Sequence, residues 1–272
     1  MGYNHHMNNI QIAQDTIKIT NDRRYLANGR EVIFDDIDVT KVIVITPEMG
    51  IELLAEDMSQ YDSEPMCRIS VVNDDSYNAS VGLNEPLVMN FANAHKAGGG
   101  FLGGAKAQEE SLCRVSTLYA SINSKEASEM YRYNNTHLNN VESDYMLISP
   151  EVLVFRGEGF ELLDKPYKVG VITAPAPNRH GAAMLASSRT VNETFTRRIR
   201  IILKAAARYG YKSLVLGAWG CGAFGNDPVT VSEIFRQVIV DEGYGRAFEE
   251  IRFAVYGRED GKNITAFRNT FA

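Results

Sequence analysis

The sequence of 272 residues contains no stretch close to 18 consecutive apolar residues, no internal repeat and no low-complexity segment. A membrane-spanning helix is not expected, because it needs about 20 apolar residues in a row. No linker rich in proline and serine divides the chain, and its hydrophobic fraction of 44% is ordinary for a globular protein. We therefore expect one domain over residues 1–272, with residues 1–35 as an N-terminal helical extension.

Paired cysteines and metal-binding patterns are also lacking. The three cysteines, Cys67, Cys113 and Cys221, cannot all pair, and none lies in a C-x-x-C spacing. The first eleven residues lack the apolar core of a secretion signal, so a reducing, cytoplasmic location is expected. The histidines show no metal-ligand spacing. No metal and no cofactor are therefore predicted.

An excess of positive charge is absent as well. The net charge of −6 provides no general attraction to nucleic acid or to anionic membranes. An anionic ligand would therefore have to be held by directed hydrogen-bond donors. We expect a monomer without nucleic-acid or membrane partners.

Seven apolar, β-rich runs recur along the chain and predict strands. They cover residues 41–46, 68–73, 86–93, 151–156, 168–174, 212–218 and 251–256. Helical patterns lie between several of them: one opens with a capping box at Thr190 and Glu193, and another has Asp227 as N-cap before Pro228. Strands that alternate with helices predict an α/β sandwich with a mostly parallel or mixed sheet.

A glycine-rich loop follows one of these strands. The strand at residues 86–93 ends with Asn90 and Asn93, and residues 98–104 then contain five glycines. In open α/β sheets, ligands bind beyond the carboxyl ends of the strands. A loop so rich in glycine opens backbone N–H groups to a ligand, as phosphate-binding loops do.

Two adjacent carboxylates follow the glycines. Residues 107–122 predict a helix whose first turn contains Gln108, Glu109 and Glu110. Acidic residues also stabilise helix N-termini without any ligand, and for two glutamates alone that interpretation would be favoured. The glycines directly before them shift the balance toward a functional site.

A second glycine loop follows the strand at residues 212–218. Four glycines lie within residues 217–225, just before the helix that begins at Asp227, and Phe224 lies among them. Such a loop suits a diphosphate, although a tight connection with Phe224 over the core is the alternative. Two glycine loops and one carboxylate pair together indicate a nucleotide diphosphate with chemistry at a sugar.

Both loops carry a resemblance to a known family. "GGGFLGGAKAQEE" (98–110) fits the GGG-x(6–8)-QEE signature of poly(ADP-ribose) glycohydrolases, and "GCGAFGNDP" (220–228) resembles the second ADP-ribose-binding loop of macrodomains. Residues 149–178 and 253–257 also resemble the bacterial-type branch, so the resemblance covers about residues 10–270. It implies a three-layer α/β/α macrodomain-like fold and hydrolysis of ribose–ribose O-glycosidic bonds from the chain end, which releases ADP-ribose.

The resemblance also implies roles for individual residues. Glu110 would be the catalytic acid/base, Glu109 would hold the ribose hydroxyls beside the scissile bond, and Asn93 would bind the distal ribose. The other substrate-binding residues would be Gln108, Gly98, Gly99 and Gly100 of the first loop, and Gly220, Cys221, Gly222, Ala223, Phe224 and Gly225 around the diphosphate and distal ribose. Asp74 or Asp75 could read the adenine amino group, although the pair equally suits a turn.

This chemistry explains why a glycine loop precedes two glutamates. Cleavage passes through an oxocarbenium-like state, and the leaving oxygen needs a proton. One carboxylic acid can donate that proton and then, as a carboxylate, activate water. Adjacent residues of a helix point about 100° apart, so Glu109 and Glu110 are expected to have different roles.

Other functions stay open on the sequence alone. A hydrolase of mono-ADP-ribosylated acceptors would use the same pocket, and residues 123–140 could shape the groove that distinguishes it. A non-catalytic ADP-ribose-binding module is disfavoured by the intact glutamates. A cysteine nucleophile is disfavoured because His95 is the only histidine near Cys113 in the sequence. Tyr256 could stack on adenine or pack at the rim.

Overall fold

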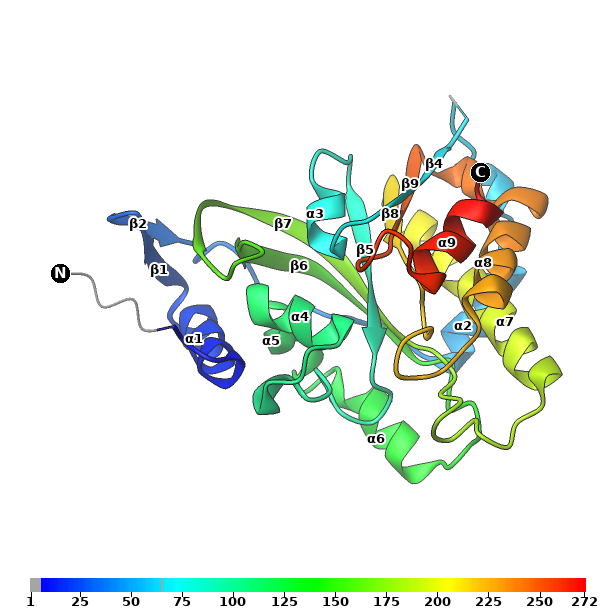
Figure 1. Ribbon diagram of the computed structural model, residues 1–272, viewed down its shortest axis with the longest axis horizontal. Helices are drawn as coiled ribbons and strands as arrows, with labels where there is room; N and C mark the ends of the chain where they lie inside the picture. Colours follow the sequence, from blue (N-terminus) through cyan, green and yellow to red (C-terminus); the bar gives the residue numbers. More distant parts are fainter. Residues whose placement is uncertain (1–5, 65) are drawn as a thin grey trace.

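The computed structural model describes residues 6–64 and 66–272. Seven of its strands form one mixed sheet in the order β3-β6-β7-β5-β8-β9-β4 (Figure 1). Five run parallel, whereas β6 is antiparallel to β7 and β3 is antiparallel to β6. The strands are β3 (Ile43–Ile45), β4 (Arg68–Val72), β5 (Pro86–Ala92), β6 (Met146–Arg156), β7 (Leu162–Pro175), β8 (Ser213–Leu216) and β9 (Glu250–Ala254). Each predicted strand segment is found, and the mixed α/β sheet is confirmed.

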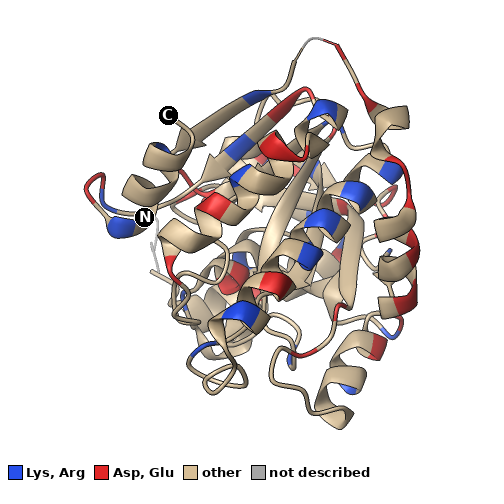
Figure 2. Ribbon diagram, turned by 90° about the vertical axis from the view of Figure 1, so that its right-hand side faces the viewer, with Lys and Arg blue, Asp and Glu red and all other residues tan. Residues whose placement is uncertain are grey.

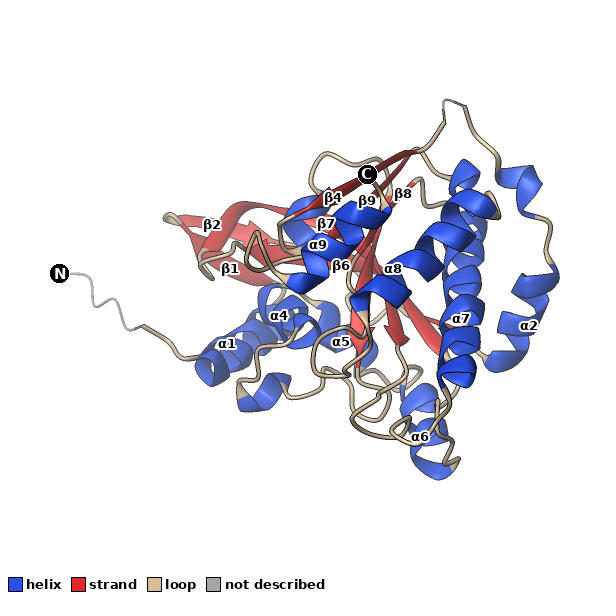
Figure 3. Ribbon diagram, turned by 45° about the vertical axis from the view of Figure 1, so that its right-hand side comes forward, coloured by secondary structure: helices blue, strands red, loops and turns tan. Residues whose placement is uncertain are grey.

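Helices cover both faces of the sheet, because its strands direct alternate side chains into two hydrophobic clusters. On β5, Leu87 and Met89 enter one cluster and Val88 enters the other. The first face carries α2 (Pro47–Ala55), α7 (Ser188–Arg208), α8 (Pro228–Arg236) and α9 (Lys262–Thr270). The second carries α1 (Asn9–Asp22), α3 (Ser76–Ser80), α4 (Gln108–Val115), α5 (Leu118–Ile122) and α6 (Ser128–Thr136). Figure 3 shows the resulting three layers, as expected for a macrodomain-like fold.

The N-terminal segment differs in part from the expected helical extension. Helix α1 is present, but β1 (Arg24–Ala27) and β2 (Arg30–Ile33) form an antiparallel hairpin after it. Asn28 and Gly29 have φ of 49° and 76°, and an Asn-Gly turn of this kind favours a two-residue hairpin over a continued helix. Residues 1–5 of the expected extension lie outside the described residues.

The helix predicted over residues 107–122 is broken into α4 and α5. The break follows Val115, because the chain there bonds to strand β6 instead of continuing its helical ladder. The Thr117 N–H donates to the Leu153 carbonyl at 3.0 Å, and the Leu153 N–H donates to Thr117 Oγ1 at 3.0 Å. The two helical segments are therefore correct, and their continuity was wrong.

One of the two predicted helix N-termini is confirmed and the other is wrong. Asp227 caps α8 as predicted, and its carboxylate accepts a hydrogen bond from the Val229 N–H at 3.2 Å. Helix α7 instead begins at Ser188, where Ser187 Oγ accepts a hydrogen bond from the Thr190 N–H at 3.1 Å. The predicted cap at Thr190 was wrong, because an earlier serine takes that position.

The sheet leaves an opening at the carboxyl end of its central strands. Strand β5 pairs with β8 only over residues 86–88, whereas it pairs with β7 as far as Ala92. The last residues of β5 therefore have a strand neighbour on one side only.

Figure 2 shows Lys and Arg positions interspersed with Asp and Glu positions. No helix among residues 6–64 and 66–272 has the length and apolar character needed to cross a membrane.

The core between α8, α9 and the sheet gives a stability prediction. Phe253 is fully buried and packs against Phe235, Phe267 and Phe271. We expect Phe253→Ala to lower the free energy of unfolding by about 3–5 kcal/mol, because a cavity replaces these contacts. Urea denaturation measures this change. The exposed Ile51→Ala on α2 is the control, and an equal loss in both variants would contradict the assignment of the core.

Candidate active site

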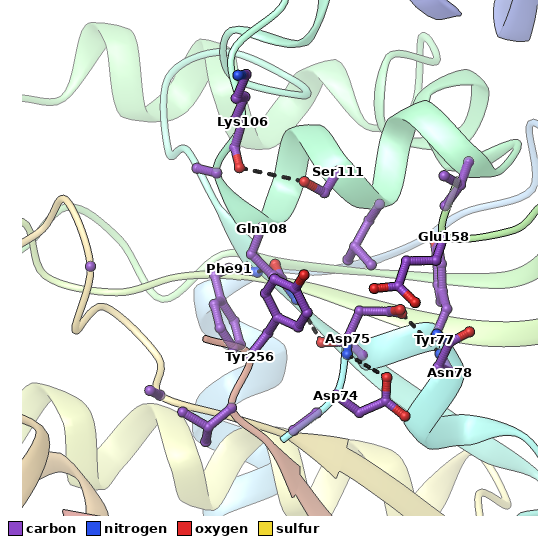
Figure 4. Close-up of a pocket in the computed structure, with 18 of the residues that line it drawn as sticks. Asp74, Asp75, Tyr77, Asn78, Phe91, Lys106, Gln108, Ser111, Glu158 and Tyr256 are labelled. Carbon is purple, nitrogen blue, oxygen red and sulfur yellow. Dashed lines mark hydrogen bonds between the residues drawn. The ribbon is translucent and has the colours of Figure 1, made fainter. Parts of the chain in front are cut away.

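A cavity of about 610 Å³ opens at the carboxyl ends of the parallel strands, where ligands bind in sheets of this kind. Its lining includes residues 74–78 after β4, Phe91 on β5, residues 106–108 at the start of α4, residues 218–220 and 222–224 after β8, residues 254–256, and residues 156–158 with Phe160 in the β6–β7 hairpin. Figure 4 shows Asp74, Asp75, Gln108 and Tyr256 in this lining. The volume suits a small-molecule ligand.

The glycine loop lies directly on the two glutamates. Gly98 and Gly99 have φ of 72° and 55°, in the left-handed region that favours glycine. A β-carbon on Gly99 would lie 2.8 Å from Glu110 Oε1 and 3.3 Å from Glu109 Oε1. A β-carbon on Gly100 would lie 2.7 Å from that of Ala105. Residues with side chains at these positions would push the loop off the carboxylates.

Glu109 is almost fully buried and held at both oxygens. Its Oε1 accepts a hydrogen bond from the Asn93 backbone N–H at 2.9 Å, and its Oε2 accepts one from Asn90 Nδ2 at 2.9 Å. Burial raises the pKa of Glu109 to about 8, and the neighbouring charge of Glu110 adds to the rise while the hydrogen bonds oppose it. Glu109 is therefore mostly protonated near neutral pH.

Glu110 has one fixed oxygen and one open oxygen. Its Oε1 accepts a hydrogen bond from the Gly100 N–H at 3.0 Å. Its Oε2 is buried and has no hydrogen-bond partner among the described residues. A buried carboxylate oxygen without a partner is rare in proteins. The carboxyl group therefore has one oxygen free to form a further hydrogen bond.

Gln108 replaces the strand neighbour that β5 lacks at its end. Its Oε1 accepts a hydrogen bond from the Phe91 N–H at 2.8 Å, and its Nε2 donates to the Met89 carbonyl at 2.7 Å and to Ser76 Oγ at 3.2 Å. The side-chain amide thus pairs with β5 as a backbone peptide of an adjacent strand would. It fixes the first turn of α4 to the sheet, and it also lines the cavity.

The second glycine loop reaches the cavity with only part of its length. Gly220, Gly222, Ala223 and Phe224 line the cavity, whereas Cys221 and Gly225 do not. Gly220 and Gly225 have φ of 73° and 71°. A β-carbon on Gly220 would lie 2.8 Å from Asn226 Nδ2, and this amide donates to the Gly220 carbonyl at 2.9 Å. Asn226 therefore holds the loop in its shape.

Asn93 shapes the first loop from within. Its Oδ1 accepts hydrogen bonds from the N–H groups of His95 and Lys96, at 2.8 and 3.0 Å. Asn90, which the sequence placed at the same strand end, is fully buried, and its Nδ2 also donates to Thr173 Oγ1 at 3.0 Å. Nothing in the sequence indicated that Asn90 holds Glu109.

The rest of the cavity lining combines expected and unexpected residues. Asp74, Asp75 and Tyr256 line it, and burial raises the pKa of Asp75, which caps α3. Sequence reasoning missed the residues of the β6–β7 hairpin, as well as Tyr167 and Asn263, which also line the cavity. The hairpin "RGEGFE" carries only a turn signal, so nothing in the sequence pointed to a ligand there.

The cysteines and histidines do not form a reactive pair within the described residues. Burial raises the pKa of the Cys221 thiol to about 12, and it also raises that of Cys113. The imidazole of His95 bonds to Asn135 and Glu142 instead of a thiol. No group of three or more His, Cys, Asp or Glu side chains in residues 6–64 and 66–272 could hold a metal ion.

Comparison with known proteins gives one family. The family model for the microbial-type PARG catalytic domain matches residues 13–157, PARG being poly(ADP-ribose) glycohydrolase. No curated protein sequence matches the chain significantly.

Solved structures of the same family align over nearly the whole chain. Poly(ADP-ribose) glycohydrolase from Thermomonospora curvata is 34% identical, with a TM-score of 0.88 over 97% of this chain and 99% of that chain. A structure of that enzyme bound to the inhibitor ADP-HPD is 35% identical, with a TM-score of 0.86 over 96% and 98%. The Deinococcus radiodurans enzyme in complex with ADP-ribose is 35% identical, with a TM-score of 0.80 over 88% and 98%. With its glycine loop folded onto adjacent glutamates, the chain belongs to the microbial-type poly(ADP-ribose) glycohydrolase family.

Proposed function

We propose that this chain hydrolyses the ribose–ribose O-glycosidic bonds of poly(ADP-ribose) from the chain end and releases ADP-ribose. The observation that carries this proposal is the carboxylate of Glu110, with Oε1 held by the Gly100 N–H and Oε2 buried without a partner. The two relatives from Thermomonospora and Deinococcus are poly(ADP-ribose) glycohydrolases, and the second was solved with ADP-ribose.

In this proposal Glu110 is the general acid and then the general base. The protonated carboxyl donates its proton to the leaving ribose oxygen as the glycosidic bond breaks, which leaves an oxocarbenium-like sugar. The carboxylate then accepts a proton from a water molecule, and the hydroxide bonds to the anomeric carbon. The products are two free hydroxyls, and Glu110 regains its proton.

Glu109 would bind the ribose hydroxyls beside the scissile bond. Its raised pKa supports this role, because a neutral carboxyl group can donate a hydrogen bond to a ribose hydroxyl. The bonds from Asn93 and Asn90 keep its carboxyl group in one orientation. Asn93 and the backbone of Gly98, Gly99 and Gly100 would contact the distal ribose and the phosphates.

The rest of the ligand would occupy the cavity. The backbone of residues 220–225 would wrap the diphosphate, and Phe224 would pack on the distal ribose. Asp74 or Asp75 would accept hydrogen bonds from the adenine amino group, a role that their position in the lining supports. Gln108 would contact the substrate from the start of α4.

We also propose a domain organisation and a cellular location for the chain. We infer one domain over residues 1–272, because α1 shares a hydrophobic cluster with α3, α4, α5 and α6, and its Asp15 pairs with Arg156 of β6. A cytoplasmic location is supported by the cysteines, which are all free. Two of them, Cys113 and Cys221, are buried.

The role of Glu110 can be tested by Glu110→Gln. We expect release of ADP-ribose from purified poly(ADP-ribose) to fall by about 10²–10⁴-fold, because the variant cannot donate a proton. Calorimetry should show ADP-ribose affinity within a few-fold of wild type. The control is Glu52→Gln on the exposed side of α2. Unchanged turnover in Glu110→Gln would contradict the role, and a wild type that acts only on mono-ADP-ribosylated protein would contradict the polymer as substrate.

The raised pKa of Glu109 predicts a pH dependence of stability. The pKa rises from 4.5 to about 8 on folding, so between these values the folded protein binds a proton that the unfolded chain has released. Stability due to Glu109 is thus fully present below about pH 4.5 and is lost as the pH rises to about 8. In Glu109→Gln the side chain is neutral at every pH, so this loss of stability does not occur.

Urea denaturation of wild type and Glu109→Gln at about pH 5 and about pH 9 measures this effect. The variant should gain stability relative to wild type as the pH rises, on the order of a few kcal/mol. Glu52→Gln should show no such gain. A constant difference between wild type and Glu109→Gln across this range would mean that Glu109 titrates normally.

The pairing of Gln108 with β5 predicts a loss in Gln108→Ala. The Phe91 N–H and the Met89 carbonyl would lose their partner, which costs about 1–3 kcal/mol of stability for each buried group left unpaired. Turnover should also fall, because the first turn of α4 carries both glutamates. Denaturation and kinetics measure both effects, with the exposed Glu52→Gln on α2 as control. Unaltered stability would show that the amide does not support β5.

A further inference from the structure

His95 lies between β5 and the glycines, and the proposed reaction does not use its side chain. Its Nδ1 lies 2.8 Å from Asn135 Oδ1, and its Nε2 lies 3.0 Å from Glu142 Oε1. Its carbonyl oxygen accepts a hydrogen bond from Asn135 Nδ2 at 3.0 Å. The imidazole thus bridges the glycine loop, the end of α6 and the segment at residues 139–145 that leads into β6.

Both partners of the ring are hydrogen-bond acceptors. The amide of Asn135 is oriented by the bond from its Nδ2 to the His95 carbonyl, so its oxygen faces Nδ1. The carboxylate of Glu142 can only accept. A neutral imidazole carries one N–H and a cationic imidazole carries two, so the ring can donate to one or both of these acceptors. The His95 side chain is 42% exposed, whereas that of Glu142 is 7% exposed.

A second connection runs beside the first. Asn134, which is 2% exposed, donates through Nδ2 to the Ala94 carbonyl at 2.9 Å. Its Oδ1 accepts a hydrogen bond from Ser143 Oγ at 2.6 Å. Asn134 therefore joins Ala94 of the loop to Ser143, and the next residue of α6, Asn135, bonds to His95.

The segment at residues 139–145 is itself fixed by α7. The buried guanidinium of Arg198 donates to Asp144 Oδ1 at 2.9 Å, to the Pro175 carbonyl at the end of β7 at 3.1 Å, and to the Val141 carbonyl. Glu142 has a φ of 62°, a left-handed conformation that is unfavourable for a residue with a side chain and persists only where its surroundings impose it. His95 is thus anchored to a rigid base.

The anchored residue is adjacent to the catalytic contacts. The backbone N–H of Asn93 holds Glu109, and Asn93 Oδ1 accepts the N–H groups of His95 and Lys96. The Gly99 N–H then donates to the Lys96 carbonyl at 3.0 Å. A shift of His95 would reach both Glu109 and the glycine turn through one or two hydrogen bonds.

We propose that the His95–Glu142 pair is a positioning device that holds the glycine loop on Glu109 and Glu110. Neither residue lines the cavity or bonds to Glu109 or Glu110, so the pair acts on turnover through the position of the loop. The expected effect on turnover rests on the proposed function. The expected effect on the position of the loop rests on the hydrogen bonds alone.

Four variants test this role in the full chain. His95→Phe and Glu142→Ala remove the bridge. Glu142→Gln preserves it, because its amide N–H can donate to an unprotonated Nε2 while the Nδ1–H still bonds to Asn135. The control is His137→Phe, at the exposed end of α6, where the ring stacks on Tyr133. We expect kcat on poly(ADP-ribose) to fall about ten-fold or more in the first two, because small misplacements in an active site are costly.

Glu142→Gln and His137→Phe should keep kcat and the dissociation constant of ADP-ribose within about two-fold of wild type, because the loop stays in place in both. Unchanged kcat in His95→Phe would overturn the proposal. So would an equal loss of kcat in Glu142→Gln and Glu142→Ala, because the first variant preserves the bridge and the second removes it.

Amide hydrogen exchange at residues 98–100 gives a readout that does not need activity. Exchange should be faster in His95→Phe and Glu142→Ala than in wild type, Glu142→Gln and His137→Phe. If wild type releases no ADP-ribose from the polymer, the proposed function fails, and the exchange rates still decide whether His95 holds the loop. Equal exchange in all of these proteins would overturn that role.

Discussion

Gly99 is the point at which the glycine loop comes closest to the carboxylates, and this contact determines what the surrounding structure has to do. A side chain there would meet Glu110 Oε1 at 2.8 Å. The loop therefore has to hold a left-handed turn, and its neighbours have to keep it in place. The N–H groups of Gly100 and Asn93 then hold one oxygen of each glutamate. Without the loop, Glu110 would lose the hydrogen bond from the Gly100 N–H.

The closeness of the loop has an electrostatic consequence. It buries two adjacent carboxyl groups, and no lysine, arginine or histidine in the described part of the chain forms an ion pair with either. Two uncompensated buried charges would be very unfavourable. Burial instead raises the pKa of Glu109 to about 8, so that the pair retains a proton near neutral pH. The raised pKa of Glu109 thus avoids a buried double charge.

The sheet provides the room that this arrangement needs. Because β8 leaves β5 after Val88, the end of β5 is open on one side and the cavity forms there. Gln108 satisfies the backbone groups of Phe91 and Met89 at the opening. The same side chain that completes the strand therefore places the next two residues, Glu109 and Glu110, beneath the loop. The order glutamine, glutamate, glutamate follows from this geometry.

The sequence by itself determined the strands, the two glycine loops, the carboxylate pair and the cap at Asp227, because each depends on residues close together in the chain. Only the tertiary structure decided the features that depend on distant partners. Ser116 and Thr117 end α4 because β6 lies beside them. Residues 156–160 join the cavity because β6 and β7 carry the hairpin there. The direction of His95 depends on Glu142, 47 residues away. Local sequence patterns indicate which helix, strand or loop a segment can form. Hydrogen bonds between distant segments exist only once the chain has folded.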